Sequence, residues 1–208
     1  MTSEKYKPTY ILIALNVILY IVGAISGGNA LETSNSVILE WGQVNAAVLL
    51  TGAYWQLVTS MFIHASIFHL VGNMLFLLIF GLRGEGMFSL PEYLGIYLVG
   101  GLVGNVLSLG LGIAPGGVLF VSVGASGAIF AMFGACVIYG RRAVRQSILS
   151  ALVFAFFLFV INSGEGVNIL AHFGGLAFGL IIGYILASRR KPHQEDTDKQ
   201  FQYRTMPF

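Results

Sequence analysis

The sequence predicts an all-α membrane protein built from six transmembrane helices. Of its 208 residues, 56% are hydrophobic and only 10% are charged, whereas a typical soluble domain carries about 25% charged residues. The mean hydropathy is +0.82, and the chain contains 27 glycines, which suits membrane helices that pack at short range. These values exclude a disordered chain and argue against a water-soluble globular domain.

Six apolar segments approach the length of about 20 residues that one membrane crossing needs. They lie at about residues 8–26, 66–82, 92–112, 123–140, 147–162 and 167–188. The long connector between the first two, residues 27–65, has mixed polarity and carries Trp41, Tyr54 and Trp55. Because aromatic rings favour the headgroup level, we expect this connector to be membrane-associated. We predict one transmembrane domain over residues 1–190 and a polar cytoplasmic tail over residues 191–208.

The basic residues predict the orientation independently of hydropathy. With six crossings and a cytoplasmic N-terminus, all 11 lysines and arginines fall on the cytoplasmic side, in agreement with the positive-inside rule. The outer connectors carry only the acidic residues Glu32, Glu40 and Glu165. Both termini are therefore expected in the cytoplasm. The net charge of +2, without a basic stripe, does not indicate binding to nucleic acid.

Four polar side chains lie at membrane depth, where a polar group is costly and therefore informative. Ser126 lies at the outer end of the fourth segment, and His172 lies near the outer end of the sixth. His69 and Asn73 are four residues apart in the second segment, so they share one helix face. All four lie within about 10 Å of the outer ends of their segments. Three helices thus bring a hydroxyl, two imidazoles and an amide to a comparable depth.

These groups are the ones that nucleophilic serine chemistry requires. A serine hydroxyl attacks a carbonyl when a base such as a neutral imidazole takes its proton. The oxyanion that forms needs hydrogen-bond donors, which the side chains of Asn73 and His69 and the backbone N–H of Ser126 can supply. Gly124 and Gly127 flank the serine and allow a sharp bend there.

Small residues line one face of the sixth segment and recur in the fourth. They are Gly175, Gly179 and Gly183 on the stripe that contains His172, and Gly127, Ala131 and Gly134 in the fourth segment. Ridges of this kind let two membrane helices approach closely. We expect this packing to bring Ser126 and His172 together without a third residue that holds the histidine.

On these residues the sequence resembles the rhomboid family of intramembrane serine proteases. The matching motifs are His64-x4-His69-x3-Asn73, Gly124-x-Ser126-Gly127 and Ala171-His172-x2-Gly175-x3-Gly179. The resemblance implies a dyad in which Ser126 is the nucleophile and His172 is the general base and then the general acid. It also implies an oxyanion role for His69 and Asn73. The fifth segment and the loop at residues 162–167 would be a movable gate and cap.

Three positions depart from the family's pattern. The Trp-Arg pair of the first loop appears as Trp55-Gln56, and the last glycine of a Gly-x3-Glu-x3-Gly pattern appears as Ser89. The aromatic residue that stacks on the histidine, commonly tyrosine, is Phe130 here. None of these departures removes a catalytic group.

The site and the resemblance together predict a serine endopeptidase that cleaves membrane-protein substrates in the outer half of the bilayer. No metal and no cofactor are required. Helix-breaking residues in the substrate should favour cleavage, because an intact helix hides its carbonyls in intrahelical hydrogen bonds. The expected location is a prokaryotic plasma membrane.

Two other classes of function stay open, namely a non-proteolytic rhomboid-like protein that binds membrane clients and a proton-coupled transporter. A transporter could use His69 and His172 as a relay, but the segment centres lack acidic residues and the chain shows no inverted repeat. A zinc site of His64, His69 and His172 requires His64 to lie in a loop. On a helix, residues five positions apart point about 140° away from each other.

Overall fold

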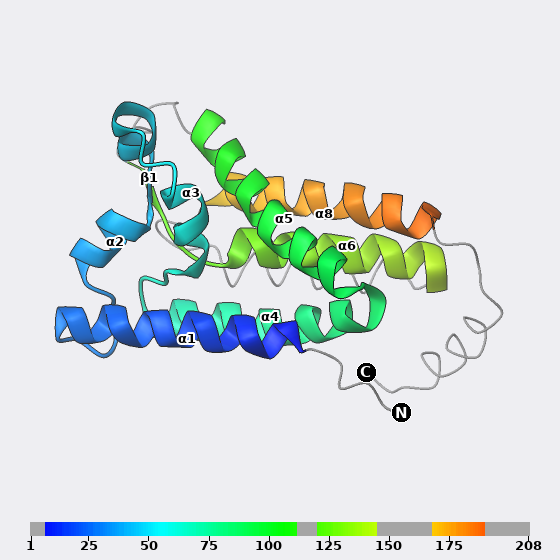
Figure 1. Cartoon of the computed structure of the whole chain (residues 1–208), viewed down its shortest axis with the longest axis horizontal. Coiled ribbons are helices and arrows are strands. Elements are labelled where there is room, and N and C mark those ends of the chain that lie inside the picture. The colour runs from blue at the N-terminus through cyan, green and yellow to red at the C-terminus, as the bar shows by residue number, and fades with distance from the viewer. Residues whose placement is uncertain (1–6, 112–119, 145–167, 190–208) are drawn as a thin grey trace.

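A computed structural model describes residues 7–111, 120–144 and 168–189, which are mostly helical (Figure 1). The helices long and apolar enough to cross a membrane are α1 (Pro8–Gly27), α4 (Ile67–Met87), α5 (Leu90–Leu111) and α8 (Ile169–Arg189). A fifth helix, α6 (Ser126–Val144), has a shorter apolar stretch over Ser126–Gly140. These helices agree with the predicted all-α membrane class. The fifth predicted segment, 147–162, and the predicted tail, 191–208, lie outside the described residues.

Five of the predicted segments correspond to helices of the described residues, but some of their ends differ. The second segment is predicted to end at residue 82, whereas α4 continues to Met87. The fourth is predicted to begin at residue 123, whereas α6 begins at Ser126. The residues before the helix explain the later start: Val121 and Ser122 form a short strand, and Gly124 has a φ of +118°, which lies outside the helical region.

Short elements, rather than one long loop, fill the connector between α1 and α4. They are α2 (Asn35–Trp41), strand β1 (Gln43–Val44), the π-helix η1 (Ala47–Thr51), α3 (Gln56–Thr59) and the 3-10 helix η2 (Ser60–Phe62). Strand β1 pairs antiparallel with β2 (Val121–Ser122), so that Gln43 lies opposite Ser122. The connector elements α2, β1 and α3 gather at one end of the helices, on the left in Figure 1. This pairing joins the connector to the segment that leads into Ser126.

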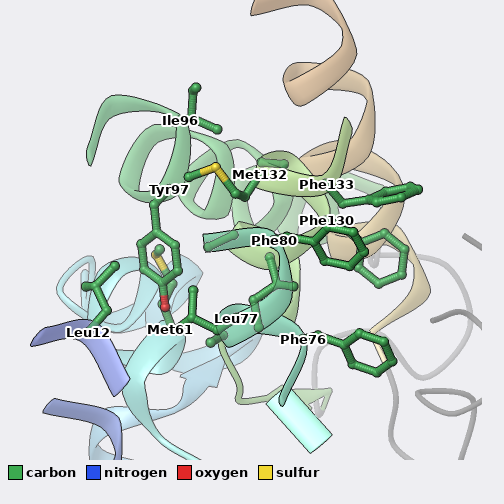
Figure 2. Packing of buried hydrophobic residues seen from close by; sticks show 14 of the residues in the cluster. Leu12, Met61, Phe76, Leu77, Phe80, Ile96, Tyr97, Phe130, Met132 and Phe133 are labelled. Carbon is green, nitrogen blue, oxygen red and sulfur yellow. The ribbon is translucent and has the colours of Figure 1, made fainter. Parts of the chain in front are cut away.

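Side chains of α1, α4, α5 and α6, together with Met61 of η2, form the core (Figure 2). Leu77, Tyr97 and Met132 are fully buried there, and the ring of Phe80 meets that of Phe133 edge to face with centroids 4.9 Å apart. Large apolar side chains also cover the outside of the helices: Ile25 of α1 and Phe68 of α4 are 74% and 82% exposed. An apolar exterior of this kind suits a helix bundle that is surrounded by lipid.

Candidate active site

Ser126 lies at a strand-turn-helix junction. As the first residue of α6, it has a backbone N–H without an intrahelical acceptor. The turn before it depends on Gly124, whose φ of +118° is a conformation that residues with a side chain rarely adopt. The N–H of Gly124 donates to the carbonyl of Ser60 at 2.9 Å. The junction therefore presents the serine at the N-terminus of a helix and is held by the connector.

The imidazole of His172 contacts the hydroxyl of Ser126. The distance between His172 Nε2 and Ser126 Oγ is 2.6 Å, although the two residues are 46 positions apart in the sequence. The imidazole is buried and stacks on the ring of Phe130, with centroids 4.6 Å apart and an interplanar angle of 19°. Within the described part of the chain, Nδ1 of His172 has no hydrogen-bond partner. The phenyl ring of Phe130 is thus the contact that fixes the plane of the imidazole.

Contact between the backbones of α6 and α8 accounts for this proximity. A Cβ atom at Gly175 or Gly179 would overlap a carbonyl oxygen of α6, and one at Gly183 would lie 2.6 Å from such an oxygen. The contacts pair Gly175 with Gly127, Gly179 with Ala131 and Gly183 with Ala135. From one pair to the next, the residue number increases by four in both helices, so the two helices run parallel and in register.

His69 and Asn73 reach the turn that precedes Ser126. They lie on one face of α4, and a Cβ atom at Gly124 would lie 2.7 Å from His69 Nε2 and 3.8 Å from Asn73 Nδ2. The amide of Asn73 donates to the carbonyl of His69 at 2.9 Å. Because a side-chain amide carries two N–H groups, one donor remains for another acceptor. The structure therefore brings together all four polar residues that the sequence singled out.

His64, the first residue of the motif that contains His69 and Asn73, packs against this site. It lies in the loop before α4, and its ring meets that of His69 edge to face at a centroid distance of 5.1 Å. Burial lowers the pKa of His64 to about 3, and the neighbouring His69 adds to this effect. The neutral ring accepts a long hydrogen bond of 3.5 Å from the N–H of Ala125 through Nε2.

The loop position of His64 meets the geometric condition that a zinc site would have required. Nevertheless, residues 7–111, 120–144 and 168–189 contain no group of three or more histidine, cysteine or acidic side chains suited to a metal ion. The described geometry therefore gives no support to the zinc alternative.

Gln56, where the family's pattern has arginine, is a buried anchor of the connector. Its Oε1 accepts from the N–H of Val44 at 2.9 Å. Its Nε2 donates to the carbonyls of Leu39 and Glu40 at 2.9 and 3.2 Å. The neutral amide thus holds backbone groups of α2 and β1 without a charge.

A polar cluster around Asn168 was not predicted from the sequence. Asn168 precedes α8 and contacts Ser108 of α5 and Ser122 of β2. A recognisable signal existed, because asparagine directly before an apolar helical segment is a common N-cap. The two serine partners could not be found in this way, since they are far from Asn168 in the sequence.

Comparison with known proteins is consistent with this geometry. The family model for the Rhomboid domain matches residues 51–189, which is most of the chain and includes Ser126 and His172. The chain belongs to the rhomboid family. It is an integral membrane protein of that family, and its apolar helices agree with this assignment.

Several curated rhomboids are similar to this chain. RHOMBOID-like protein 6, mitochondrial, of Arabidopsis thaliana is 34% identical over 184 residues, which are 83% of this chain and 57% of the relative. Rhomboid protease GluP of Bacillus subtilis is 30% identical over 184 residues, which are 85% of this chain and 34% of the relative. RHOMBOID-like protein 1 of Arabidopsis thaliana is 32% identical over 141 residues, 65% of this chain and 35% of the relative. The chain thus spans between about a third and 57% of the length of these rhomboids.

Proposed function

We propose that this rhomboid is an intramembrane serine endopeptidase with Ser126 as nucleophile and His172 as general base. The main support is the distance of 2.6 Å between Ser126 Oγ and His172 Nε2 at the N-terminal ends of two apolar helices. A neutral imidazole in this position accepts the hydroxyl proton as the oxygen attacks. The name of the relative GluP, a rhomboid protease, agrees with the proposal.

In the proposed reaction, Ser126 Oγ adds to the carbonyl carbon of a substrate peptide bond while its proton passes to His172 Nε2. The tetrahedral intermediate collapses when His172 returns that proton to the leaving nitrogen. This step breaks the C–N bond and leaves an ester on Ser126. A water molecule then attacks the ester, gives one proton to His172 and releases the acid, after which the proton returns to Ser126.

The oxyanion of the intermediate needs donors that are already in place. We assign this role to the free N–H of Asn73, to a ring N–H of His69 and to the backbone N–H of Ser126. The support is the approach of His69 and Asn73 to Gly124, two residues before the nucleophile. Gly127, Gly175 and Gly179 support the site by keeping α8 close to α6, and Phe130 supports it by stacking on the imidazole.

The proposed substrates are membrane proteins with a single or locally unstable transmembrane segment. Their peptide must leave its helical form at the site, since helical carbonyls are already hydrogen-bonded. We also propose six crossings with both termini in the cytoplasm, supported by the positions of the 11 basic residues. In that orientation Ser126 and His172 lie in the outer half of the bilayer. A prokaryotic plasma membrane stays the predicted location, and the gate and cap at residues 147–167 lie outside the described residues.

Reconstitution of the purified protein with a labelled single-span substrate tests the proposal. Ser126→Ala and His172→Ala should each lower cleavage at least about 1,000-fold, because either change removes proton transfer and attack together. Ser188→Ala is the matched control, since Ser188 is exposed and its hydroxyl donates to the carbonyl of Tyr184 in its own helix. Its cleavage rate should equal that of the wild type.

The same experiment distinguishes the other classes. A client-binding protein or a transporter would release no fragments and would be indifferent to Ser126→Ala. Substrate binding by the wild type without fragments would therefore contradict the proposed protease. Fragments that persist in Ser126→Ala would contradict the assigned nucleophile.

A further inference from the structure

We propose that Asn168 is a positioning residue that joins the start of α8 to strand β2 and helix α5, and thereby holds His172 in register with Ser126. This inference rests on the proposed function, because it assigns a task within the same dyad. It concerns the three buried polar residues Asn168, Ser122 and Ser108, which we name the polar clasp.

Asn168 uses both ends of its amide. Its Nδ2 donates to Ser108 Oγ at 2.6 Å and to Ser122 Oγ at 2.9 Å. Its Oδ1 accepts from the N–H of Ala171 at 3.0 Å, which caps the N-terminus of α8. One side chain therefore contacts three elements, while its own exposure is only 8%.

Ser122 and Asn168 of the polar clasp are separated in the sequence by the same number of residues as Ser126 and His172. Ser122 precedes Ser126 by four residues, and Asn168 precedes His172 by four residues. The hydrogen bond between Ser122 and Asn168 and that between Ser126 and His172 both join residues 46 positions apart. Two hydrogen bonds thus join the segment from β2 to α6 with the start of α8. One links the side chains of the dyad, and the other links residues four positions earlier in each segment. A slip of α8 by one residue would break both connections.

The position of His172 in α8 explains why a separate anchor is useful. His172 lies in the first turn, where its N–H donates to the carbonyl of Asn168 at 3.2 Å. The closest backbone contacts with α6 begin at Gly175 and continue toward the other end of the helix, while the backbone of Ala171 packs on Gly104 of α5. First turns lack the full set of intrahelical hydrogen bonds. The clasp adds a directional constraint on the side from which the chain enters, because it ties α8 to β2 through hydrogen bonds.

Two variants separate this positioning from simple helix capping. Asn168→Ser keeps a good N-cap, but its side chain is too short to reach Ser108 and Ser122 as well. Ser122→Ala removes the acceptor on β2 and leaves the cap intact. For both we would measure kcat and KM with the labelled substrate, the rate at which a fluorophosphonate labels Ser126, and the thermal unfolding temperature.

We expect kcat and the labelling rate to fall about tenfold or more in both variants, because a small displacement of a reacting group costs this much. KM should change less than about twofold, since the clasp does not contact substrate. Ser122→Thr, which keeps the hydroxyl, should restore most of kcat. Labelling reports the activation of Ser126 without any need for the membrane substrate to dock.

Tyr93→Phe is the matched structural control. It removes a hydroxyl from a buried hydrogen bond of the same length, 2.9 Å between Tyr93 and Thr9. Tyr93 lies near the start of α5, whereas Ser108 of the clasp lies near its end. This variant should lose thermal stability and keep its kcat. If Asn168→Ser and Ser122→Ala behave in the same way, the clasp is only structural and the inference is overturned while the protease proposal stands. A wild type that neither cleaves nor labels overturns both.

Discussion

Two regions of this rhomboid are held together in different ways. Helices α6 and α8 meet through backbone atoms, because glycines allow carbonyl oxygens of one helix to touch the other. The connector between the observed ends of α1 and α4, residues 28–66, is held by many side-chain hydrogen bonds to backbone groups, in addition to its backbone hydrogen bonds. Examples are Thr33 to the carbonyl of His64 at 2.6 Å, Thr59 to that of Trp41 at 2.7 Å, and the contacts of Gln56.

This difference indicates which substitutions the structure tolerates. A backbone contact has no side chain that can move aside, so an added methyl group must separate the helices. A hydrogen bond from a side chain is one of several, and its loss leaves the others in place. We therefore expect all-or-none effects between α6 and α8, where Ser126 and His172 meet, and graded effects in the connector.

The largest effect should come from Gly175→Val. Its side chain would overlap the carbonyl of Gly127, so α6 and α8 must move apart and the contact between Ser126 and His172 must break. We expect cleavage to be abolished, as measured with the labelled substrate.

A matched pair of smaller changes controls for the loss of glycine itself. Gly175→Ala and Gly95→Ala make the same chemical change in two helices, but a Cβ atom at Gly95 meets no atom of the described residues within 4 Å. Only Gly175→Ala should lower activity and stability. Equal behaviour of the two variants would contradict the packing argument.

The second prediction concerns the pH dependence of cleavage. Below the pKa of His172 the imidazole is protonated and no longer accepts the proton of Ser126, so the rate should fall about tenfold per pH unit on the acid side. Initial rates from pH 8 down to the lowest pH at which the protein stays folded, together with unfolding temperatures at each pH, test this. A rate that does not fall at any pH where the protein is still folded would contradict the assignment of His172 as the base.

The region where α6 and α8 meet could be predicted from the sequence much better than the connector. Ser126, His172 and the glycines of α8 could be found because polar groups are rare at membrane depth and because helical spacing places them on one face. Helix class and most helix positions followed from hydropathy in the same way. The polar residues of the connector gave no such signal, since they contact partners that are distant in sequence.

Gln56 shows this limit most clearly. The sequence indicated only that a charged anchor was missing at this position, whereas the structure gives it three hydrogen bonds to backbone groups. Similarly, strand β2 could not be predicted, because its two residues are too few to show a periodic pattern. Non-local contacts of this kind decide the later start of α6, and they cannot be derived from local propensity.

The third prediction sharpens the graded behaviour of the connector. Gln56→Ala removes the hydrogen bonds to part-buried backbone groups of Val44 and Leu39, which should lower the free energy of unfolding by about 1–3 kcal/mol. The folded fraction should still cleave substrate at close to the wild-type rate, because Gln56 contacts neither Ser126 nor His172. Unfolding in detergent and cleavage at low temperature measure the two effects separately. Loss of cleavage without loss of stability would show that the connector controls the dyad directly.

The smallest effect should come from the titration of His64. Burial lowers its pKa to about 3 in the folded protein, whereas an unfolded histidine titrates near 6.5. Between these values the unfolded state binds more protons than the folded state, so stability is lost as the pH falls below about 6.5. At pH 5.5 the loss relative to pH 8 should be about 1.4 kcal/mol from this residue.

His64→Gln isolates that contribution, because glutamine keeps an acceptor near the N–H of Ala125 but does not titrate in this range. Between pH 8 and pH 5.5, the free energy of unfolding of this variant should fall by about 1.4 kcal/mol less than that of the wild type. Parallel curves for the two proteins would mean that His64 binds a proton without leaving the fold, and that the connector is more open to water than its burial indicates. If the two curves of unfolding free energy instead converge at low pH, protonation of His64 destabilises the connector. This effect is separate from the protonation of His172, whose imidazole faces Ser126.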